Sequence, residues 1–174
     1  WSDSGYFYGT QGAKLALRNK DAKQTEITIG NTSAFQEGKV YSQEASSQIA
    51  AILLSPKDGD CILDMCASPG SKTTQIVSIV KNNALVIANE VSPDRYVKLR
   101  NNLHHFGVVC HAITALDTSY FARNYVNTFD KILVDAPCSG EGMYFKFPAV
   151  INHWNLKTVK FNAKRQRKIL TDAF

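Results

Sequence analysis

The residues with the clearest chemical potential form the run Asp135-Ala136-Pro137-Cys138-Ser139-Gly140, which follows the apolar segment 131–134. A cysteine just after a proline at the end of a strand is presented to the ligand crevice of an α/β sheet. Its thiolate could then act as a nucleophile in covalent catalysis. The competing interpretation is a small buried apolar residue, which describes most free cysteines.

A second stretch that could hold a ligand follows the apolar segment 61–65 and consists of Cys66, Ala67, Ser68, Pro69, Gly70, Ser71 and Lys72. Its small residues let a ligand approach the backbone, and Gly70 permits a tight turn with positive φ. The helix expected after it offers free N–H groups to an anionic group. The stretch has one glycine, and Ser71 separates it from Lys72, so neither a dinucleotide loop nor a P-loop is matched.

Two acidic residues follow the next two apolar segments. Glu90 comes after segment 84–88 and could accept hydrogen bonds from both ribose hydroxyls of a nucleoside cofactor. Asp117 comes after segment 108–114 and could accept from an adenine amino group. Either residue alone is more often a helix cap or a surface charge, but together with the glycine-containing loop they favour a cofactor site. S-adenosylmethionine fits this layout, because its methyl group is already electrophilic and needs only to be oriented.

The elements that must position these residues alternate along the chain. Apolar runs predict buried strands at 61–65, 84–88, 108–114 and 131–135. Between them we expect helices over 71–82, with Ile76, Ile79 and Val80 inward, and from Pro93 to about His105. Strands that alternate with helices indicate βαβ units and a parallel sheet.

The first 44 residues give weaker signals. Short strands are expected at Tyr6–Tyr8 and Thr25–Ile29. A helix is expected after Ser42 as its N-cap, with an inward face made of Ala45, Ile49, Ile52 and Leu53. We therefore divide the chain into an N-terminal segment, 1–40, and an α/β core, 41–174.

These motifs resemble those of the sun-type RNA cytosine-5 methyltransferases, and most of all the bacterial branch that modifies 16S ribosomal RNA (the RsmF type). The matching stretches are 41–47, 64–75, 89–90, 117, 135–142, 152–154 and 165–166. The resemblance implies a Rossmann-like, S-adenosylmethionine-dependent methyltransferase fold, with a mostly parallel sheet and helices on both faces. It also implies that Cys66 to Lys72, Glu90, Asp117 and Asp135 bind the methyl donor.

The resemblance gives Cys138 a catalytic role. Carbon 5 of cytosine becomes nucleophilic when a thiolate adds to carbon 6. The family uses two cysteines, of which the one after proline assists product release and the other, the nucleophile, lies in a later Thr-Cys segment. This sequence has no Thr-Cys pair. Either the chain is a piece of a longer protein and Cys138 releases the product, which we favour, or Cys138 itself attacks.

Composition agrees with an RNA partner. The net charge is +5 and the pI is about 9.0, which mildly favours an anionic partner. Basic residues gather near residues 157–168, either as a solvated helix face or as contacts to phosphates. The four cysteines form no C-x-x-C pair, so we expect no metal site and a reducing, cytoplasmic location. No segment is apolar enough to suggest a membrane partner. We expect ribosomal RNA as the substrate; the alternatives are a transfer RNA cytosine methyltransferase and a cofactor- and RNA-binding assembly factor without turnover.

Overall fold

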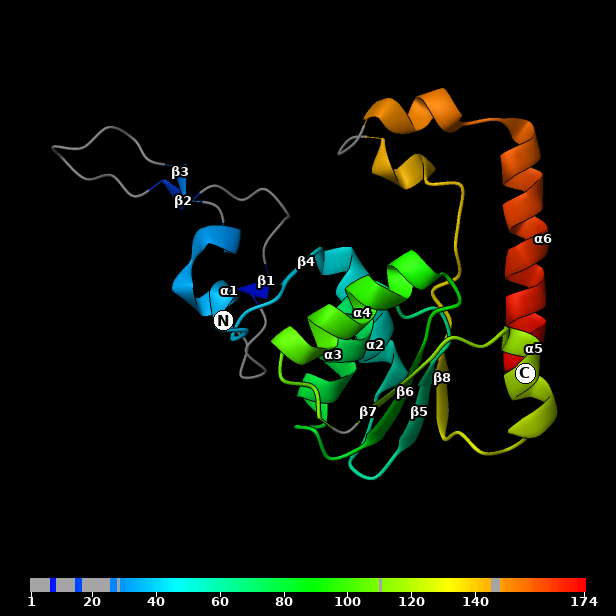
Figure 1. The fold of residues 1–174 in the computed structure, drawn as a ribbon, viewed down its shortest axis with the longest axis horizontal. Helices are drawn as coiled ribbons and strands as arrows, with labels where there is room; N and C mark the ends of the chain where they lie inside the picture. Colours follow the sequence, from blue (N-terminus) through cyan, green and yellow to red (C-terminus); the bar gives the residue numbers. More distant parts are fainter. Residues whose placement is uncertain (1–6, 9–14, 17–25, 28, 110, 145–147) are drawn as a thin grey trace, which may run out of the picture.

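The computed structural model describes residues 7–8, 15–16, 26–27, 29–109, 111–144 and 148–174 (Figure 1). Its centre is a parallel sheet of four strands in the spatial order β7–β6–β5–β8. The strands are β5 (Cys61–Asp64), β6 (Leu85–Asn89), β7 (His111–Thr114) and β8 (Lys131–Leu133). Strands β6 and β7 lie on one side of β5, and the chain then crosses to place β8 on the other side. In such sheets, ligands bind beyond the carboxyl ends of the strands at the point where the strand order reverses, here between β5 and β8.

Helices cover both faces of this sheet (Figure 1). Helices α2 (Ala45–Leu54), α3 (Ser71–Ile79) and α4 (Pro93–His105) lie on one face, and α5 (Thr118–Asn124) and α6 (Leu156–Ala173) on the other. Successive strand residues point to opposite faces. Accordingly Ile62 packs with α2, α3 and α4, whereas its neighbour Leu63 packs with α5 and α6. The predicted α/β fold with a parallel sheet and helices on both faces is confirmed.

Smaller elements precede and follow the core. Strand β1 (Phe7–Tyr8) pairs in parallel with β4 (Ser42–Gln43), and β2 (Leu15–Ala16) pairs antiparallel with β3 (Glu26–Ile27). A 3-10 turn η1 (Ile29–Asn31) leads into α1 (Ser33–Gln36). The turns η2 (Glu141–Met143) and η3 (Pro148–His153) connect β8 to α6. The strands expected near residues 7 and 26 are present, but Ile29, expected in the second of them, begins η1 instead. Tyr6, Thr25 and Thr28 lie outside the described residues.

The predicted inward face of α2 is wrong. Ile49, Ile52 and Leu53 are 52%, 54% and 78% exposed. The face that meets α3 and β8 instead carries the buried residues Gln48 and Ala51. Gln75 Nε2 of α3 donates to the backbone oxygen of Gln48 in α2 at 3.1 Å. The close approach of α2 and α3 is therefore made by the small side chain of Ala51 and by hydrogen-bonded amides, and not by branched apolar residues.

Element boundaries also differ from the expectations. The N-cap of α2 is Glu44, because Ser42 is paired in β4. Helix α3 ends at Ile79 rather than at residue 82, because Lys81 and Asn82 adopt positive φ. The side chain of Ile79 is exposed, whereas that of Val80 is buried as expected. Strand β7 begins at His111 rather than at residue 108. Among the described residues, no helix combines the length and the apolar character needed to cross a membrane.

Candidate functional site

The loop after β5 is fixed to the ends of both neighbouring strands. The Met65 N–H donates to Leu133 O in β8 at 3.0 Å, and the Ala67 N–H donates to Asn89 O in β6 at 2.9 Å. Ala67 and Ser68 are buried beneath the loop surface, whereas Pro69 is exposed. Gly70 then caps α3 in the left-handed region, with φ of +104°. The backbone of the predicted ligand loop is therefore held in place from two sides.

Asn89 joins three strand ends through its side-chain amide. Its Nδ2 donates to Met65 O at 3.3 Å and to Leu116 O at 2.9 Å. Its Oδ1 accepts from Thr114 Oγ1 at 2.8 Å and from the Leu116 N–H at 3.0 Å. The side chain is almost fully buried, with 1% exposed. Asn89 thereby sets the relative positions of the residues that follow β5, β6 and β7.

Glu90 is buried at the end of β6, as expected for a ligand-binding carboxylate. Its Oε1 accepts from the Ser92 N–H at 2.9 Å, and its Oε2 lies 3.4 Å from Arg95 Nε. Arg95 also donates from Nη2 to Ser68 O at 2.7 Å and so connects Glu90 to the loop after β5. Arg95 was not among the predicted site residues, and its only signal in the sequence is its place in the first turns of the helix after Glu90.

Asp117 has two roles in the structure. It is the N-cap of α5, because its Oδ1 accepts from the Ser119 N–H at 3.0 Å and from Ser119 Oγ at 2.6 Å. The same oxygen accepts from Lys168 Nζ of α6 at 3.0 Å. The hydrogen bond from Ser119, followed by the one from Lys168, lowers the pKa of Asp117 to about 2. Oδ2 is left without a hydrogen bond to the described residues.

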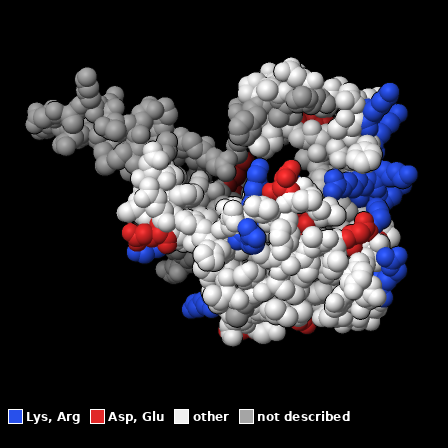
Figure 2. Space-filling view, viewed as in Figure 1, with Lys and Arg blue, Asp and Glu red and all other residues white. Residues whose placement is uncertain are grey.

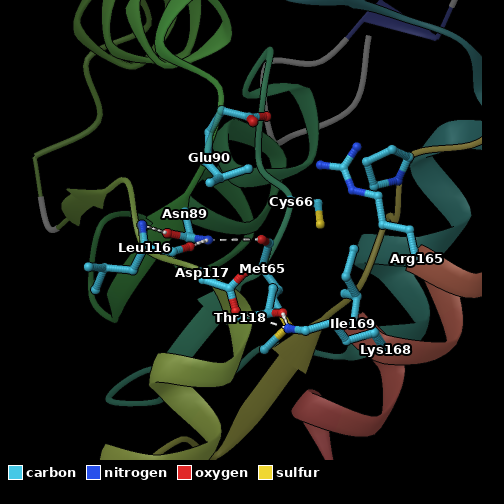
Figure 3. A pocket seen from close by; sticks show the side chains of 12 residues that line it. Met65, Cys66, Asn89, Glu90, Leu116, Asp117, Thr118, Arg165, Lys168 and Ile169 are labelled. Carbon is cyan, nitrogen blue, oxygen red and sulfur yellow. Dashed lines mark hydrogen bonds and ion pairs between the residues drawn. The ribbon is translucent and has the colours of Figure 1, made fainter. Parts of the chain in front are cut away.

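A pocket of about 80 Å³, partly open to solvent, lies at these strand ends (Figure 3). Three of the predicted site residues, Cys66, Glu90 and Asp117, line it together. Its opposite wall comes from Arg165, Lys168 and Ile169 of α6, none of which was predicted to line a pocket. The remaining lining residues are Met65, Asn89, Val91, Leu116, Thr118 and Pro137.

Lys72 and Asp135, which were also predicted to bind the donor, do not line this pocket and pair with each other. Lys72 Nζ lies 2.6 Å from Asp135 Oδ2, and 15% of the lysine side chain is exposed against 57% of the aspartate. The pair links the first turn of α3 to the segment after β8, so the two predicted motifs do meet.

Asp64, the last residue of β5, is a buried acid whose ionisation is influenced by the charges of Lys72 and Asp135. Thr73 Oγ1 donates to its Oδ2 at 2.7 Å, whereas Oδ1 has no hydrogen-bond partner within the described residues. Burial raises the pKa of the Asp64 carboxyl to about 6, against the lowering effects of Thr73 and Lys72. Asp64 was not among the predicted site residues, although it stands directly before the ligand loop.

Replacing Asp64 with asparagine is expected to change how stability depends on pH. The folded-state pKa of Asp64, about 6, lies above its ordinary value of 3.8, so between these pH values the folded protein binds more protons than the unfolded chain. The free energy of unfolding therefore falls by about 3 kcal/mol from this group as pH rises from about 4 to 7. Urea titrations of both proteins at both pH values measure the free energy of unfolding. The value for Asp64→Asn, relative to wild type, should be higher at pH 7 than at pH 4 by that amount.

The variant Asp58→Asn offers a control, because it makes the same chemical change at an exposed position. Equal pH dependence of the wild type and Asp64→Asn would show that Asp64 ionises normally in the folded state.

Cys138 and Cys66 differ in environment. Burial, with the charges of Asp64 and Glu90, raises the pKa of the Cys66 thiol to about 11, so Cys66 is a poor source of thiolate. Cys138 is exposed in the segment after β8. Gln166 Nε2 of α6 donates to the preceding carbonyl, Pro137 O, at 2.9 Å. Of these two cysteines, Cys138 is accessible to a macromolecular substrate.

The segment after Cys138 is joined to the start of α6. Ser139 Oγ donates to Glu141 Oε2, and Trp154 Nε1 donates to Glu141 Oε1 at 2.9 Å. Trp154 is 48% exposed, so its ring is not a core residue. Within the described residues, no group of three or more His, Cys, Asp or Glu side chains could hold a metal ion. Cys110 lies outside them.

Comparisons with known proteins show the family to which the chain belongs. A family model described as 16S rRNA methyltransferase RsmB/F matches residues 51–174. A tRNA (cytosine(49)-C(5))-methyltransferase of Pyrococcus abyssi is 39% identical over 152 residues, which are 87% of this chain and 49% of that protein. A ribosomal RNA small subunit methyltransferase F of Photobacterium profundum is 36% identical over 100% of this chain and 35% of its own length.

A solved structure shows the same arrangement. The crystal structure of NSun6 from Pyrococcus horikoshii with SFG is similar with a TM-score of 0.76 and 32% identity, over 84% of this chain and 37% of that chain. The chain spans 35% to 49% of the length of the two curated relatives described above.

Proposed function

Because this chain belongs to the 16S rRNA methyltransferase RsmB/F family, we propose that the whole protein methylates carbon 5 of cytosine in RNA with S-adenosylmethionine as methyl donor. One observation carries the proposal. The pocket at the strand ends brings together Glu90, Asp117 and Cys66, and its wall includes Pro137, the residue directly before the accessible Cys138. A nucleoside site beside an accessible thiol is what cytosine carbon 5 chemistry requires.

The residues at the pocket fit the donor. S-adenosylmethionine would supply an electrophilic methyl group. The buried Glu90 carboxylate can accept from ribose hydroxyls, and Oδ2 of Asp117 can accept from the adenine amino group. Oδ1 of Asp64, which has no partner among the described residues, can accept from the donor's ammonium group. The loop from Cys66 to Lys72, with Asp135 paired to Lys72, would hold the methionine part.

Cys138 would act on the cytosine ring. In the reaction, a thiolate would add to carbon 6, and carbon 5 of the resulting enamine would take the methyl group as the donor's sulfur–methyl bond breaks and a neutral thioether leaves. Loss of the carbon 5 proton then restores the ring as the thiol is eliminated. By the two-cysteine scheme Cys138 assists this last step. The cytosine must be unstacked to reach the thiol, so a single-stranded or flipped target is expected.

Replacing Cys138 with alanine in the full-length protein tests both the reaction and the role. With methyl-labelled donor and cytosine-containing RNA, wild type is expected to form 5-methylcytosine. If Cys138 releases the product, Cys138→Ala should accumulate a covalent protein–RNA adduct that resists denaturant and is visible as a shifted band on a gel. Cys61→Ala, in β5 away from the pocket, should behave as wild type.

The remaining outcomes separate the alternatives. Loss of both adduct and methyl transfer in Cys138→Ala would make Cys138 the attacking group. Wild-type protein that binds the donor but modifies no RNA would instead support an assembly factor. Offering 16S ribosomal RNA and transfer RNA side by side tests the substrate; we propose ribosomal RNA, although the relatives include enzymes of both kinds. A cytoplasmic location, too, stays a proposal.

A further inference from the structure

The outward face of α6 carries a regular row of positive charge. Its members, which we call the α6 stripe, are Lys157, Lys160, Lys164 and Arg167. Spacings of three, four and three residues place side chains on one face of an α-helix. All four residues are exposed, and Figure 2 shows blue side chains gathered along the edge of the molecule where Figure 1 places α6.

The charge of the α6 stripe is not neutralised by the described part of the protein. The four side chains take part in no ion pair or hydrogen bond with described residues. Lys168, one turn after Lys164, differs because it pairs with Asp117 and Asp172 at 3.0 and 2.7 Å. Lys160, Lys164 and Arg167 also line a shallow depression of about 270 Å³ together with Ala163. The stripe therefore offers a cationic surface that an external anion could neutralise.

An exposed aromatic ring interrupts this cationic surface. Phe161 is 67% exposed and lies four residues after Lys157 and three before Lys164, so it neighbours both on the helix. Surfaces that bind single-stranded nucleic acids combine cations that follow the backbone with aromatic rings on which bases stack. Phe161 among these lysines matches that combination.

The α6 stripe lies on the helix whose opposite face contacts the candidate site. From the inner side of the same helix, Gln166 donates to Pro137 O, the carbonyl before Cys138, at 2.9 Å. Arg165 and Lys168 line the donor pocket from that helix as well. A strand of RNA bound to the outward face of α6 would therefore lie one helix diameter, roughly 10 Å, from the segment that presents Cys138.

We propose that the α6 stripe, with Phe161, binds the backbone and one base of a single-stranded RNA segment that flanks the target cytosine. This inference rests on the proposed function, since it names the surface that holds the substrate of that site. The stripe spans eleven residues, from Lys157 to Arg167, and so about 15 Å along the helix axis, enough to contact several phosphates. Four phosphate contacts on single-stranded RNA give a slope of log affinity against log salt of about −2.8.

The test measures binding of a fluorescent, cytosine-containing single-stranded RNA of about 12 nucleotides, a length within the range that such surfaces cover. Fluorescence anisotropy is recorded at several salt concentrations. In the double variant Lys160→Gln/Lys164→Gln the slope should become shallower by about 1.4, and affinity at about 50 mM salt should fall by about 10- to 100-fold. Phe161→Leu should weaken binding about fivefold or more without changing the slope.

The matched control removes the same charge elsewhere. Lys57→Gln/Lys98→Gln replaces two exposed lysines that make no ion pair with described residues, one in the loop before β5 and one on α4. It should keep the wild-type slope. Titration of each variant with S-adenosylmethionine should give the wild-type dissociation constant, which shows that the fold and the donor pocket are intact.

Three outcomes would overturn the inference. Equal RNA affinity and slope in the stripe and control variants would place the RNA elsewhere. Wild-type protein that binds the donor but not the RNA would refute the stripe as an RNA surface while leaving donor binding in place. A stripe variant that loses binding to vesicles containing phosphatidylserine, but not to RNA, would make the partner a lipid surface. Failure of donor binding with RNA binding retained would count against the proposed function alone.

Discussion

Replacing Glu90 with alanine is expected to lower the affinity for S-adenosylmethionine by at least about 100-fold. The buried carboxylate can accept two hydrogen bonds from ribose, and each such bond to a charged acceptor contributes about 1.5 to 3 kcal/mol. The loss also releases Arg95 Nε from its ion pair, so the connection between Glu90 and Ser68 O is broken at the same time. Isothermal titration calorimetry with S-adenosylmethionine or an unreactive analogue measures the effect.

Glu37→Ala gives the matched control, because Glu37 is an exposed carboxylate that pairs with Lys39 outside the pocket. It should bind the donor as wild type does. An affinity within about threefold of wild type in Glu90→Ala would refute a direct contact between Glu90 and the ribose, since such a change is below the contribution of one charged hydrogen bond.

Replacing Gly70 with alanine is expected to lower the free energy of unfolding by about 2 to 5 kcal/mol. The φ of +104° is unfavourable for an alanine, which alone costs about 1 to 2 kcal/mol. The new Cβ would also lie 3.2 Å from Leu99 Cδ1 and 3.4 Å from Leu103 Cδ2, both fully buried side chains, and such overpacking costs about 1 to 3 kcal/mol more. Urea denaturation measures the change.

Gly59→Ala separates the two contributions to this loss. Gly59 also has a positive φ, +84°, but a Cβ there would meet no atom within 4 Å. Only the backbone strain should remain, so Gly59→Ala should lose about 1 to 2 kcal/mol. Because Gly70 also ends the loop from Cys66, Gly70→Ala should weaken donor binding, whereas Gly59→Ala should not. Equal losses of stability in the two variants would show that the contacts of Gly70 with α4 are unimportant.

The sheet could be predicted from the sequence because the strands of a parallel sheet are covered on both faces. Segments such as 61–65 and 84–88 are therefore continuously apolar and easily distinguished from the helices between them. The site could be predicted in part because the carboxyl ends of such strands meet at one edge. Glu90 and Asp117, which are 27 residues apart, do line the same pocket.

Other features could not be predicted from local patterns. Ile49, Ile52 and Leu53 form a regular apolar face, yet α2 turns Gln48 and Ala51 inward because the approach of α3 leaves room only for a small residue and hydrogen-bonded amides. The pocket wall formed by α6 depends on contacts such as Lys168 with Asp117, 51 residues away. From the sequence, a helix cap and a ligand-binding residue were alternative interpretations of Asp117. In the structure, Asp117 both caps α5 and lines the pocket.

Asn89 imposes an evolutionary constraint on this fold. The two N–H groups of its side-chain amide donate to two carbonyl oxygens, and the amide oxygen accepts from one backbone N–H and one hydroxyl. Aspartate has the same shape but would turn an acceptor toward those two carbonyls, and a residue of another size would disturb a position that is 1% exposed. No other residue therefore keeps both the shape and the four hydrogen bonds of Asn89. Natural variation at the donor pocket should accumulate in the residues around Asn89, while the junction of the three strands is inherited unchanged.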